Sequence, residues 1–364
     1  MIKNAKIVAV NAHSKDYHTQ KVEDRGKPDY VMSSSDLRLF APCPSKWKNG
    51  YELPASQSLE YGSLLDCLVL TPERFEETYA LIPSTYKKTV LKCPKCGSVT
   101  ESPTCRKCKC EREEATEENP WSAKSETCQA WIEEQKQAGK EVVSQDDLTE
   151  ANKAKARLLA DEQCKLFLDS CERQVWVKAE WHDEETGLVV PVQCLIDLVA
   201  RPESPFPKSI GDLKSTKLAA IGAWSSWAHK VGYDIQAAWN TDLFVAASKR
   251  EITNFCFLLS ESAFPYEIGR RYMEQSLDDP QDMGDIASGR RQYRKIMALY
   301  CQCVKRGVWP GYDSTDESSA TGWTLVVPNP YDEQRRMFAP KIQFNDDTGE
   351  PEAAPEDANG DVIP

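Results

Sequence analysis

Three acidic residues and a lysine interrupt otherwise apolar, strand-like runs between residues 175 and 217. Glu180 lies in VWVKAEW, Asp197 lies in LVVPVQCLIDLVA, and Asp212 and Lys214 lie in IGDLKSTK. A carboxylate inside a core strand is unfavourable unless it is paired or binds a cation. Side chains two residues apart on a strand share a face, so Asp212 and Lys214 should point the same way. Two or three carboxylates and a lysine on neighbouring strands would form a divalent-metal site with a cation beside it.

The spacing Asp197-x14-Asp212-x-Lys214 assigns the two acids to consecutive strands. Three β-type runs separated by two turn-like segments, HDEETG and a proline-rich loop, predict an antiparallel meander. A plainer interpretation is equally open on spacing alone. In it, Asp212 and Lys214 form an ion pair on an edge strand, and Asp197 caps a turn.

Two predicted helices flank the meander and carry polar residues of their own. The first, LEYGSLLDCLVL, has an apolar stripe that Asp66 interrupts. The second follows the meander and has a break at Gly232, after which Tyr233, Gln236 and Asn240 fall on one face. These side chains could line the cleft that holds the metal site. The ordinary alternative is that Asp66 faces solvent and that the polar stripe is a hydrated helix face.

Basic residues are frequent around the end of the meander, among them Lys217 and Lys230. They suit contacts with phosphate groups, although a solvated charged surface is the usual explanation for such residues.

A cysteine-rich segment over residues 91–112 has the spacing of a metal site. Two Cys-x2-Cys pairs lie eight residues apart, and a glycine that permits a tight turn follows the first pair. The predicted zinc ligands are Cys93, Cys96, Cys105 and Cys108, with Cys110 as a spare. A segment this short has almost no core, so bound zinc would supply its folding energy. An iron–sulfur cluster is the rival interpretation, and the segment reads as an insertion into a helical region.

The length and composition limit the classes of protein to which this chain could belong. The chain has 364 residues, a net charge of −12 and 14 cysteines, and it is long enough for one large domain or two. Residues 345–364 contain seven acids and no base, so we expect a disordered tail. Overall acidity does not exclude DNA, because a nuclease needs only a local basic groove. No apolar run approaches about 18 residues, and we expect a cytoplasmic protein without a membrane span.

The remaining chain gives a coarse secondary-structure pattern. We expect a strand near residues 5–10, a helix capped by Ser34 or Ser35, an acidic loop over residues 111–120, helices over 125–140 and 145–170, two strands joined by a turn at Pro265, and a helix over 283–306.

Taken together, these pieces resemble the RecE-like exonucleases, the exodeoxyribonuclease VIII type of the PD-(D/E)XK nuclease superfamily. The likeness runs through SSSDLRLFAPCPSKW, YGSLLDCLVLTPERF, AEWHDEETGL, CLIDLV, IGDLKST, GYDIQAAW and WPGY. It implies an α/β fold with a central mixed sheet flanked by helices. The small zinc-ribbon-like insertion predicted from the cysteine spacing is not a core feature of that family. The implied organisation is an unassigned segment 1–30, a nuclease domain 31–312, the insertion 91–112, and an extension 313–364.

The resemblance also implies roles for individual residues. Asp197 and Asp212 match metal-binding acids, Lys214 matches the motif lysine, Gln236 matches a helix glutamine, and Glu180 matches a recurrent acid on the preceding strand. The implied metal is Mg²⁺ or Mn²⁺, and the implied DNA contacts come from Tyr233, Lys217 and Lys230. The chain departs from the family at Asp66, where histidine is usual, and at Asn240, where tyrosine is usual. Aspartate is still an oxygen ligand suited to Mg²⁺.

The activity that the resemblance implies is 5′-to-3′ digestion of linear double-stranded DNA, which leaves 3′ single-stranded tails for recombination. The implied partners are DNA ends, a RecT-like single-strand annealing protein and further copies of the chain, arranged as a ring. Two alternatives stay open. One is an endonuclease or single-strand nuclease, and the other is a catalytically silent DNA-end-binding or scaffold protein.

Overall fold

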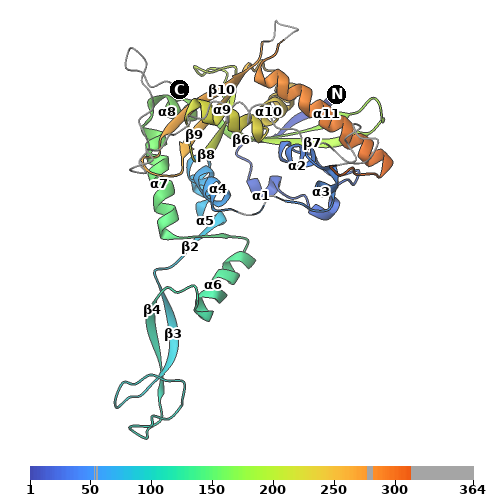
Figure 1. The fold of residues 1–364 in the computed structure, drawn as a ribbon. Coiled ribbons are helices and arrows are strands. Elements are labelled where there is room, and N and C mark those ends of the chain that lie inside the picture. Colours follow the sequence, from blue (N-terminus) through green and yellow to red (C-terminus); the bar gives the residue numbers. More distant parts are fainter. Residues whose placement is uncertain (53, 55, 277–281, 313–364) are drawn as a thin grey trace, which may run out of the picture. The chain divides into compact units, whose positions relative to one another are not determined.

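The computed structural model describes residues 1–52, 54, 56–276 and 282–312, and Figure 1 shows how their helices and strands are arranged. The chain divides after Trp309, and every helix and strand of the described residues belongs to the first unit, Met1–Trp309. The predicted extension over residues 313–364, with its acidic tail, lies outside the described residues. Among the described helices, none combines the length and the apolar character that crossing a membrane requires.

A six-stranded sheet forms the centre of the fold, in the order β1-β6-β7-β8-β9-β10. Its strands are β1 (Ile2–Ala9), β6 (Cys171–His182), β7 (Val189–Ala200), β8 (Ser209–Thr216), β9 (Asn254–Glu261) and β10 (Ile268–Glu274). Neighbouring strands are antiparallel except for β8 and β9, which are parallel. The predicted mixed sheet is confirmed, and the predicted meander is the run β6-β7-β8.

The N-terminal residues belong to this sheet. Strand β1 pairs with β6 from Ile2, opposite Trp181, to Ala9, opposite Trp176. Residues 1–30, left unassigned apart from one possible strand, therefore supply an edge of the same sheet that carries the predicted site. The predicted boundary at residue 31 does not separate two bodies of the structure.

The parallel pair requires a crossover, because the chain must return to the same end of the sheet before it enters β9. Helices α9 (Ile221–Lys230) and α10 (Tyr233–Ser248) make that return. The break between them is at Gly232, as predicted, where the backbone adopts φ +75°. Glycine accommodates this left-handed conformation without the steric penalty that a side chain would bring.

Two groups of helices bury apolar strand residues in separate clusters. One group packs against Val177, Phe257 and other side chains of the larger cluster, and the other packs against Leu198 and Leu258. Phe257 and Leu258 are neighbours on β9 yet belong to different clusters, which is the alternation expected of a sheet covered on both sides. The first group is α2 (Ser34–Phe40), α10 and α11 (Asp285–Arg306), and the second is α4 (Gln57–Leu70), α7 (Gln145–Ala160) and α8 (Glu162–Ser170).

The cysteine-rich insertion rises on a β-hairpin that Figure 1 shows between β2 and α6 along the chain. Its strand β4 occupies residues predicted as an acidic loop, so that prediction is wrong. The residues of β4 are poor strand formers, but each is paired in register with β3. The elements around the hairpin are α5 (Phe75–Thr78), β2 (Tyr79–Leu81), β3 (Thr85–Lys92), β4 (Glu113–Pro120), α6 (Glu126–Gln137) and β5 (Glu141–Val143).

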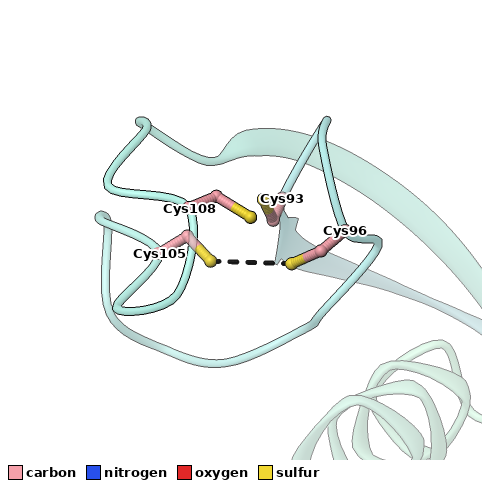
Figure 2. A group of neighbouring side chains, drawn as sticks. All are labelled: Cys93, Cys96, Cys105 and Cys108. Atoms are coloured by element: carbon pink, nitrogen blue, oxygen red, sulfur yellow. Dashed lines mark hydrogen bonds between the residues drawn. The ribbon is translucent and has the colours of Figure 1, made fainter.

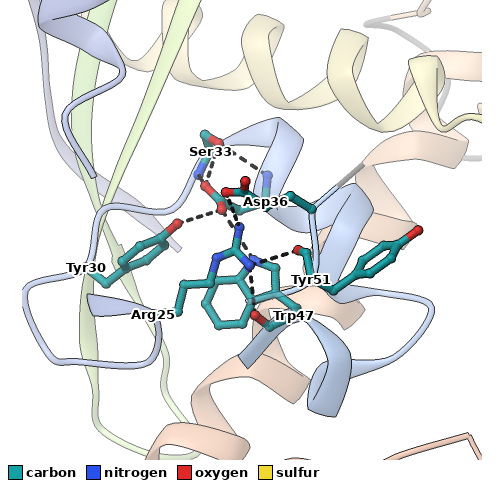
Figure 3. Close-up of polar contacts among 7 residues, drawn as sticks. Arg25, Tyr30, Ser33, Asp36, Trp47 and Tyr51 are labelled. Carbon is teal, nitrogen blue, oxygen red and sulfur yellow. Dashed lines mark hydrogen bonds and ion pairs between the residues drawn. The ribbon is translucent and has the colours of Figure 1, made fainter. Parts of the chain in front are cut away.

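The first and last motifs of the resemblance meet in a buried polar and aromatic cluster (Figure 3). The Asp36 carboxylate accepts hydrogen bonds from Tyr30 Oη at 2.7 Å and from Trp47 Nε1 at 3.3 Å. Arg25, only 5% exposed, donates to the Trp47 carbonyl oxygen at 2.9 Å. The ring of Trp309 lies 5.9 Å from that of Trp47. These motif residues therefore hold the fold together, and none of them enters the predicted metal site.

The cap of α2 differs by one residue from the prediction. Ser33, and not Ser34 or Ser35, is the N-cap, because its hydroxyl accepts from the Asp36 backbone N–H and Asp36 bonds back to the Ser33 N–H. This reciprocal capping box satisfies two backbone donors at the start of the helix. The other short segments nearby are α1 (Ser14–Tyr17), η1 (Val22–Asp24), α3 (Pro44–Lys48) and η2 (Pro72–Arg74).

Helix α11 contacts α10 at very short range through Gly289. A β-carbon at Gly289 would lie 2.0 Å from the backbone oxygen of Asp234, in the first turn of α10. The Arg290 guanidinium fixes the same pair of helices by two hydrogen bonds to Asp242, at 2.7 and 2.6 Å. Gln236 lies two residues beyond Asp234, so this contact also fixes a predicted site residue.

Replacing Gly289 with alanine should therefore destabilise the protein by at least about 2 kcal/mol, because backbone cannot yield as a flexible side chain does. Gly222→Ala is the control, since a β-carbon at Gly222 in α9 meets nothing within 4 Å. That change should be neutral or stabilising by up to about 1 kcal/mol. Urea unfolding midpoints measure both effects, and equal midpoints for the two variants would contradict the close contact.

Candidate active site and four-cysteine site

Strands β7 and β8 bring Asp197, Asp212 and Lys214 together. Lys214 forms an ion pair with Asp212, whose side chain is almost fully buried. The backbone N–H of Leu213 donates to Asp197 Oδ2 at 3.1 Å. Strand β8 lies between β7 and β9, so the Asp212–Lys214 pair is interior, and the edge-strand interpretation is wrong.

Helix α10 adds Gln236 to this group. The Gln236 Nε2 atom donates to Asp212 Oδ1 at 2.9 Å. Gln236 and Asn240 are 8% and 1% exposed, so the predicted polar stripe is not a hydrated helix face. Among the described residues, neither Gln236 Oε1 nor Asn240 Oδ1 has a hydrogen-bond partner.

The sequence did not reveal the partner of Asp197 on β6. Gln174 Nε2 donates to Asp197 Oδ1 at 3.1 Å. Gln174 has φ +49° and is skipped in the pairing of β6 with β7, between Arg173 and Val175. The register is the same on both sides of this position, so Gln174 lies directly opposite Asp197, where side chains of paired strands come close to one another. A polar residue in an otherwise apolar run was the only signal that could have singled it out.

Helix α4 places Asp66 beside the same residues. The helix comes close to β8 at Gly62, where a β-carbon would lie 3.0 Å from Ser215 Oγ. Asp66 follows Gly62 by about one helical turn. Burial raises the pKa of the Asp66 carboxyl to about 7, with a further contribution from Asp212, although Lys214 acts in the opposite direction. Asp66 is therefore close enough to Asp212 and Lys214 to interact with them and is not the solvent-facing residue of the ordinary alternative.

The electrostatics show more negative charge than the group can neutralise. Burial raises the pKa of Asp197 well above its ordinary value, and repulsion from Asp212 and Asp66 adds to the effect. Burial lowers the pKa of Lys214, but Asp212, Tyr233 and Asp197 together outweigh it, so the net pKa of Lys214 is raised. Lys214 is thus an ammonium ion at neutral pH, facing more acids than it can offset.

Two adjoining pockets lie beside this group of residues. A pocket of about 290 Å³ is lined by Asp66, Asp197 and Gln174, but not by Asp212 or Lys214. Its lining also contains three basic or titratable residues absent from the sequence predictions, His13, His18 and Arg74. A second pocket of about 720 Å³ shares Ser63, Tyr79 and Glu141 with the first, so the two adjoin, and together they are called the groove below.

The predicted DNA-contacting residues fall into two classes. Tyr233 belongs to the site, because its ring centre lies 5.1 Å from Lys214 Nζ and its ring stacks on Phe257. Lys217 and Lys230 are exposed, on the loop after β8 and at the end of α9. No ion pair of the described residues involves either lysine.

The structure does not bring Glu180 into the group. Glu180 faces Pro191 across β6 and β7, and it bonds to His182 Nε2 and Asn4 Nδ2, each at 2.8 Å. Asp197 lies opposite Gln174, which is six residues from Glu180 along β6. At about 3.3 Å per strand residue, Glu180 is roughly 20 Å from it.

The four predicted zinc ligands converge at the tip of the β3–β4 hairpin, as Figure 2 shows. The sulfur atoms of Cys93, Cys96, Cys105 and Cys108 all lie within 4.8 Å of one another, a spacing that suits a tetrahedral metal site. Cys110, the predicted spare, has its sulfur 3.4 Å from that of Cys93. The segment is compatible with a zinc-ribbon-like insertion.

Each Cys-x2-Cys pair is closed by a turn of the same kind. The residues after the second ligands are Gly97 and Lys109, with φ +69° and +49°. Their backbone N–H groups donate to the carbonyls of Cys93 and Cys105, at 2.9 and 2.8 Å. The predicted role of Gly97 is confirmed, and the second turn adopts the same conformation with a lysine.

The comparisons with known proteins found no sequence match and a distant structural likeness. No model of a known protein family matches the chain, and no curated protein sequence matches it. A crystal structure from Eubacterium rectale, described as a "Putative exonuclease", superposes with a TM-score of 0.43 and 16% identity. The match covers 91% of this chain and 100% of the other. A likeness at this level assigns neither a family nor an activity.

The burial of the Asp66 carboxyl has a measurable consequence for the pH dependence of stability. The pKa of this carboxyl is about 7 in the folded chain and 3.8 ordinarily. The folded protein therefore loses stability as the pH rises from about 4 to about 7. Asp66→Asn should remove this penalty, so its advantage over the wild type should grow from pH 5 to pH 8, to about 2 kcal/mol. Urea unfolding without added divalent cations measures this difference.

Asp29→Asn, at an exposed position, is the control and should show no such growth. An advantage of Asp66→Asn that does not change with pH would contradict the raised pKa of this buried carboxyl.

The four-cysteine site leads to a prediction about the metal content of the protein. Purified protein should contain about one zinc per chain, and Cys105→Ser should abolish it because a tetrahedral site loses a ligand. Cys110→Ser should retain the zinc. Elemental analysis by mass spectrometry measures both, and iron in the wild type, or zinc loss in Cys110→Ser, would overturn this ligand set.

Proposed function

We propose that this protein is a metal-dependent deoxyribonuclease of the PD-(D/E)XK type. One observation carries the proposal. Asp197 and the Asp212–Lys214 pair lie together on two interior strands, and two helices add Asp66 and Gln236 to them. The acids adjoin a groove that is open to solvent, which gives a polymer access to them.

The donor set fits Mg²⁺ or Mn²⁺. Asp66, Asp197 and Asp212 offer carboxylate oxygens, which are the ligands that hard divalent cations prefer. Burial is the main cause of the raised pKa values of Asp66 and Asp197. When all three acids are ionised, the single ammonium of Lys214 leaves an excess of negative charge in the group. A divalent cation held by these carboxylates would remove that excess.

The chemistry is hydrolysis of a phosphodiester bond. Bound Mg²⁺ supplies a water of lowered pKa and stabilises charge on the phosphate and on the leaving 3′ oxygen. Lys214 and Gln236 hold the Asp212 carboxylate in place from two sides. Because Lys214 keeps its proton at neutral pH, it orients the water and offsets charge in the transition state, and does not remove a proton itself. Tyr233 and Gln236 position the DNA strand near the scissile phosphate.

The substrate and the direction of digestion that we propose are those that the sequence resemblance implies. The proposed substrate is the end of linear double-stranded DNA, and the proposed direction is 5′-to-3′, which leaves 3′ tails for recombination. A ring of identical subunits, a RecT-like single-strand annealing partner and a cytoplasmic location belong to the same proposal. Lys217 and Lys230 are candidates for contacts with the DNA backbone.

The test offers linear and closed circular duplex to the protein with Mg²⁺. We expect loss of the linear DNA alone, with label released first from 5′ ends. Asp212→Asn should lower the rate at least about 10³-fold and Lys214→Ala about 10²–10³-fold, because each removes charge at the reacting phosphate. Lys6→Ala, on the exposed side of β1, is the matched control and should retain full activity.

Other outcomes would replace the proposal in defined ways. Nicking of closed circles would indicate an endonuclease that uses the same residues. DNA binding without hydrolysis, unaltered in Asp212→Asn and Lys214→Ala, would indicate an end-binding or scaffold protein and would sink the catalytic proposal.

A further inference from the structure

The tip of the β3–β4 hairpin carries an excess of basic side chains that the catalytic proposal does not use. Four of them are fully exposed, namely Lys95, Arg106, Lys107 and Lys109. Among the residues that the structure describes, no ion pair involves any of these four. The tip, residues 93–112, contains only two acids, Glu101 and Glu111.

The stem of the same hairpin is built differently. Its lysines face glutamates across the ladder, with Lys87 opposite Glu118 and Lys88 opposite Glu117. Opposite charges placed directly across an antiparallel pair attract one another and stabilise the pairing. The charge of the stem is therefore matched within the hairpin, whereas the charge of the tip is not.

The metal site fixes the basic side chains in position. Three of them alternate with ligands in the run Cys105-Arg106-Lys107-Cys108-Lys109. The turn is closed by the bond from the Lys109 N–H to the Cys105 carbonyl at 2.8 Å. Arg112 ties the two loops together through Thr100 Oγ1, at 2.7 Å, and Ser98 Oγ, at 3.1 Å. The backbone that carries these cations is thus held in place, so binding would require little reordering of the main chain.

The charge of the metal centre itself does not cancel this surface. Four thiolates around one Zn²⁺ carry a formal charge of −2, but residues 93–112 hold five basic and two acidic side chains, so the tip keeps a net positive charge of one (5 − 2 − 2). A partner approaching the tip therefore meets the lysine and arginine side chains first. An anionic polymer is the partner that this arrangement fits.

The composition of the tip indicates which part of a nucleic acid it could contact. Residues 91–112 contain no Phe, Tyr, Trp or His. Proteins that grip unpaired bases do so largely by stacking them on aromatic rings, and the tip has none. Phosphate contacts need only cations, and they carry no sequence information. A duplex, with one negative charge per ≈ 1.7 Å of axis, is the densest target for them.

We infer that the cysteine-rich tip is a second DNA contact, which binds the phosphate backbone of duplex DNA without regard to sequence. The hairpin starts at Thr85, six residues beyond Tyr79, which lines both pockets of the groove. The tip would hold duplex that is not itself in the groove. This inference rests on the proposed function only in taking DNA as the substrate.

The experiment compares two double variants of the same hairpin. Lys107→Gln/Lys109→Gln removes two charges from the tip, and Lys87→Gln/Lys88→Gln removes two from the stem. Binding of a labelled 40-base-pair duplex is measured by fluorescence anisotropy at several salt concentrations, without added Mg²⁺ so that the DNA stays intact. The tip variant should bind at least about 10-fold more weakly, with a salt slope shallower by about 2. The stem variant should stay within about twofold of the wild type.

Loss of fold is separated from loss of charge by two measurements. The tip variant should retain its zinc, and Lys107→Arg/Lys109→Arg should restore both the affinity and the salt slope. A tip variant that retains zinc and binds with the wild-type slope would overturn the inference, even if the wild type hydrolyses DNA. Tip-dependent binding by a wild type that fails to hydrolyse DNA with Mg²⁺ would support the inference and reject the catalytic proposal.

Discussion

Asp66, Asp197 and Asp212 repel one another where little water is present to screen them, and a single ammonium, on Lys214, lies among them. Such a group opposes folding unless the surrounding structure holds it in place. The structure does so from both sides, with β8 in the interior of the sheet and with α4 and α10 packed beside it. Contacts far from the acids, such as the one between Gly289 and Asp234, contribute by fixing the helix that carries Gln236.

Much of this arrangement follows from simple periodicity in the sequence. Asp212 and Lys214 lie two residues apart on a strand, and the period of two places them on one face, where they pair. The period of 3.6 puts Tyr233 and Gln236 on the face of α10 that meets β8. The break at Gly232 and the convergence of the four cysteines also follow from local chemistry, because glycine tolerates a left-handed turn and two Cys-x2-Cys pairs have the spacing that suits a tetrahedral metal site.

The residues that were missed depend on pairings that no local pattern contains. Gln174 reaches Asp197 because the register of β6 with β7 places the two residues opposite each other, and nothing in RQVWV indicates that register. Glu180 has the expected residue type on the expected strand, but its place along the strand follows from the register and lies far from Asp197. Strand β4 has the composition of a loop and is a strand only because β3 lies beside it. His13 and His18 reach the groove from the N-terminal region, whose position in the fold no local pattern indicates.

The hairpin leaves and re-enters the body of the protein at a single place. Thr85 and Pro120 are partners across the ladder, and the Trp121 N–H donates to the Ser84 carbonyl at 2.9 Å. Everything between them is a closed loop whose two ends already touch. Such a segment can be gained, lost or exchanged in evolution by one insertion or deletion, without stretching the chain on either side. For a protein engineer the same junction is a cassette site, where a short turn or an unrelated small domain can replace the cysteine-rich tip while the sheet and its acids stay as they are.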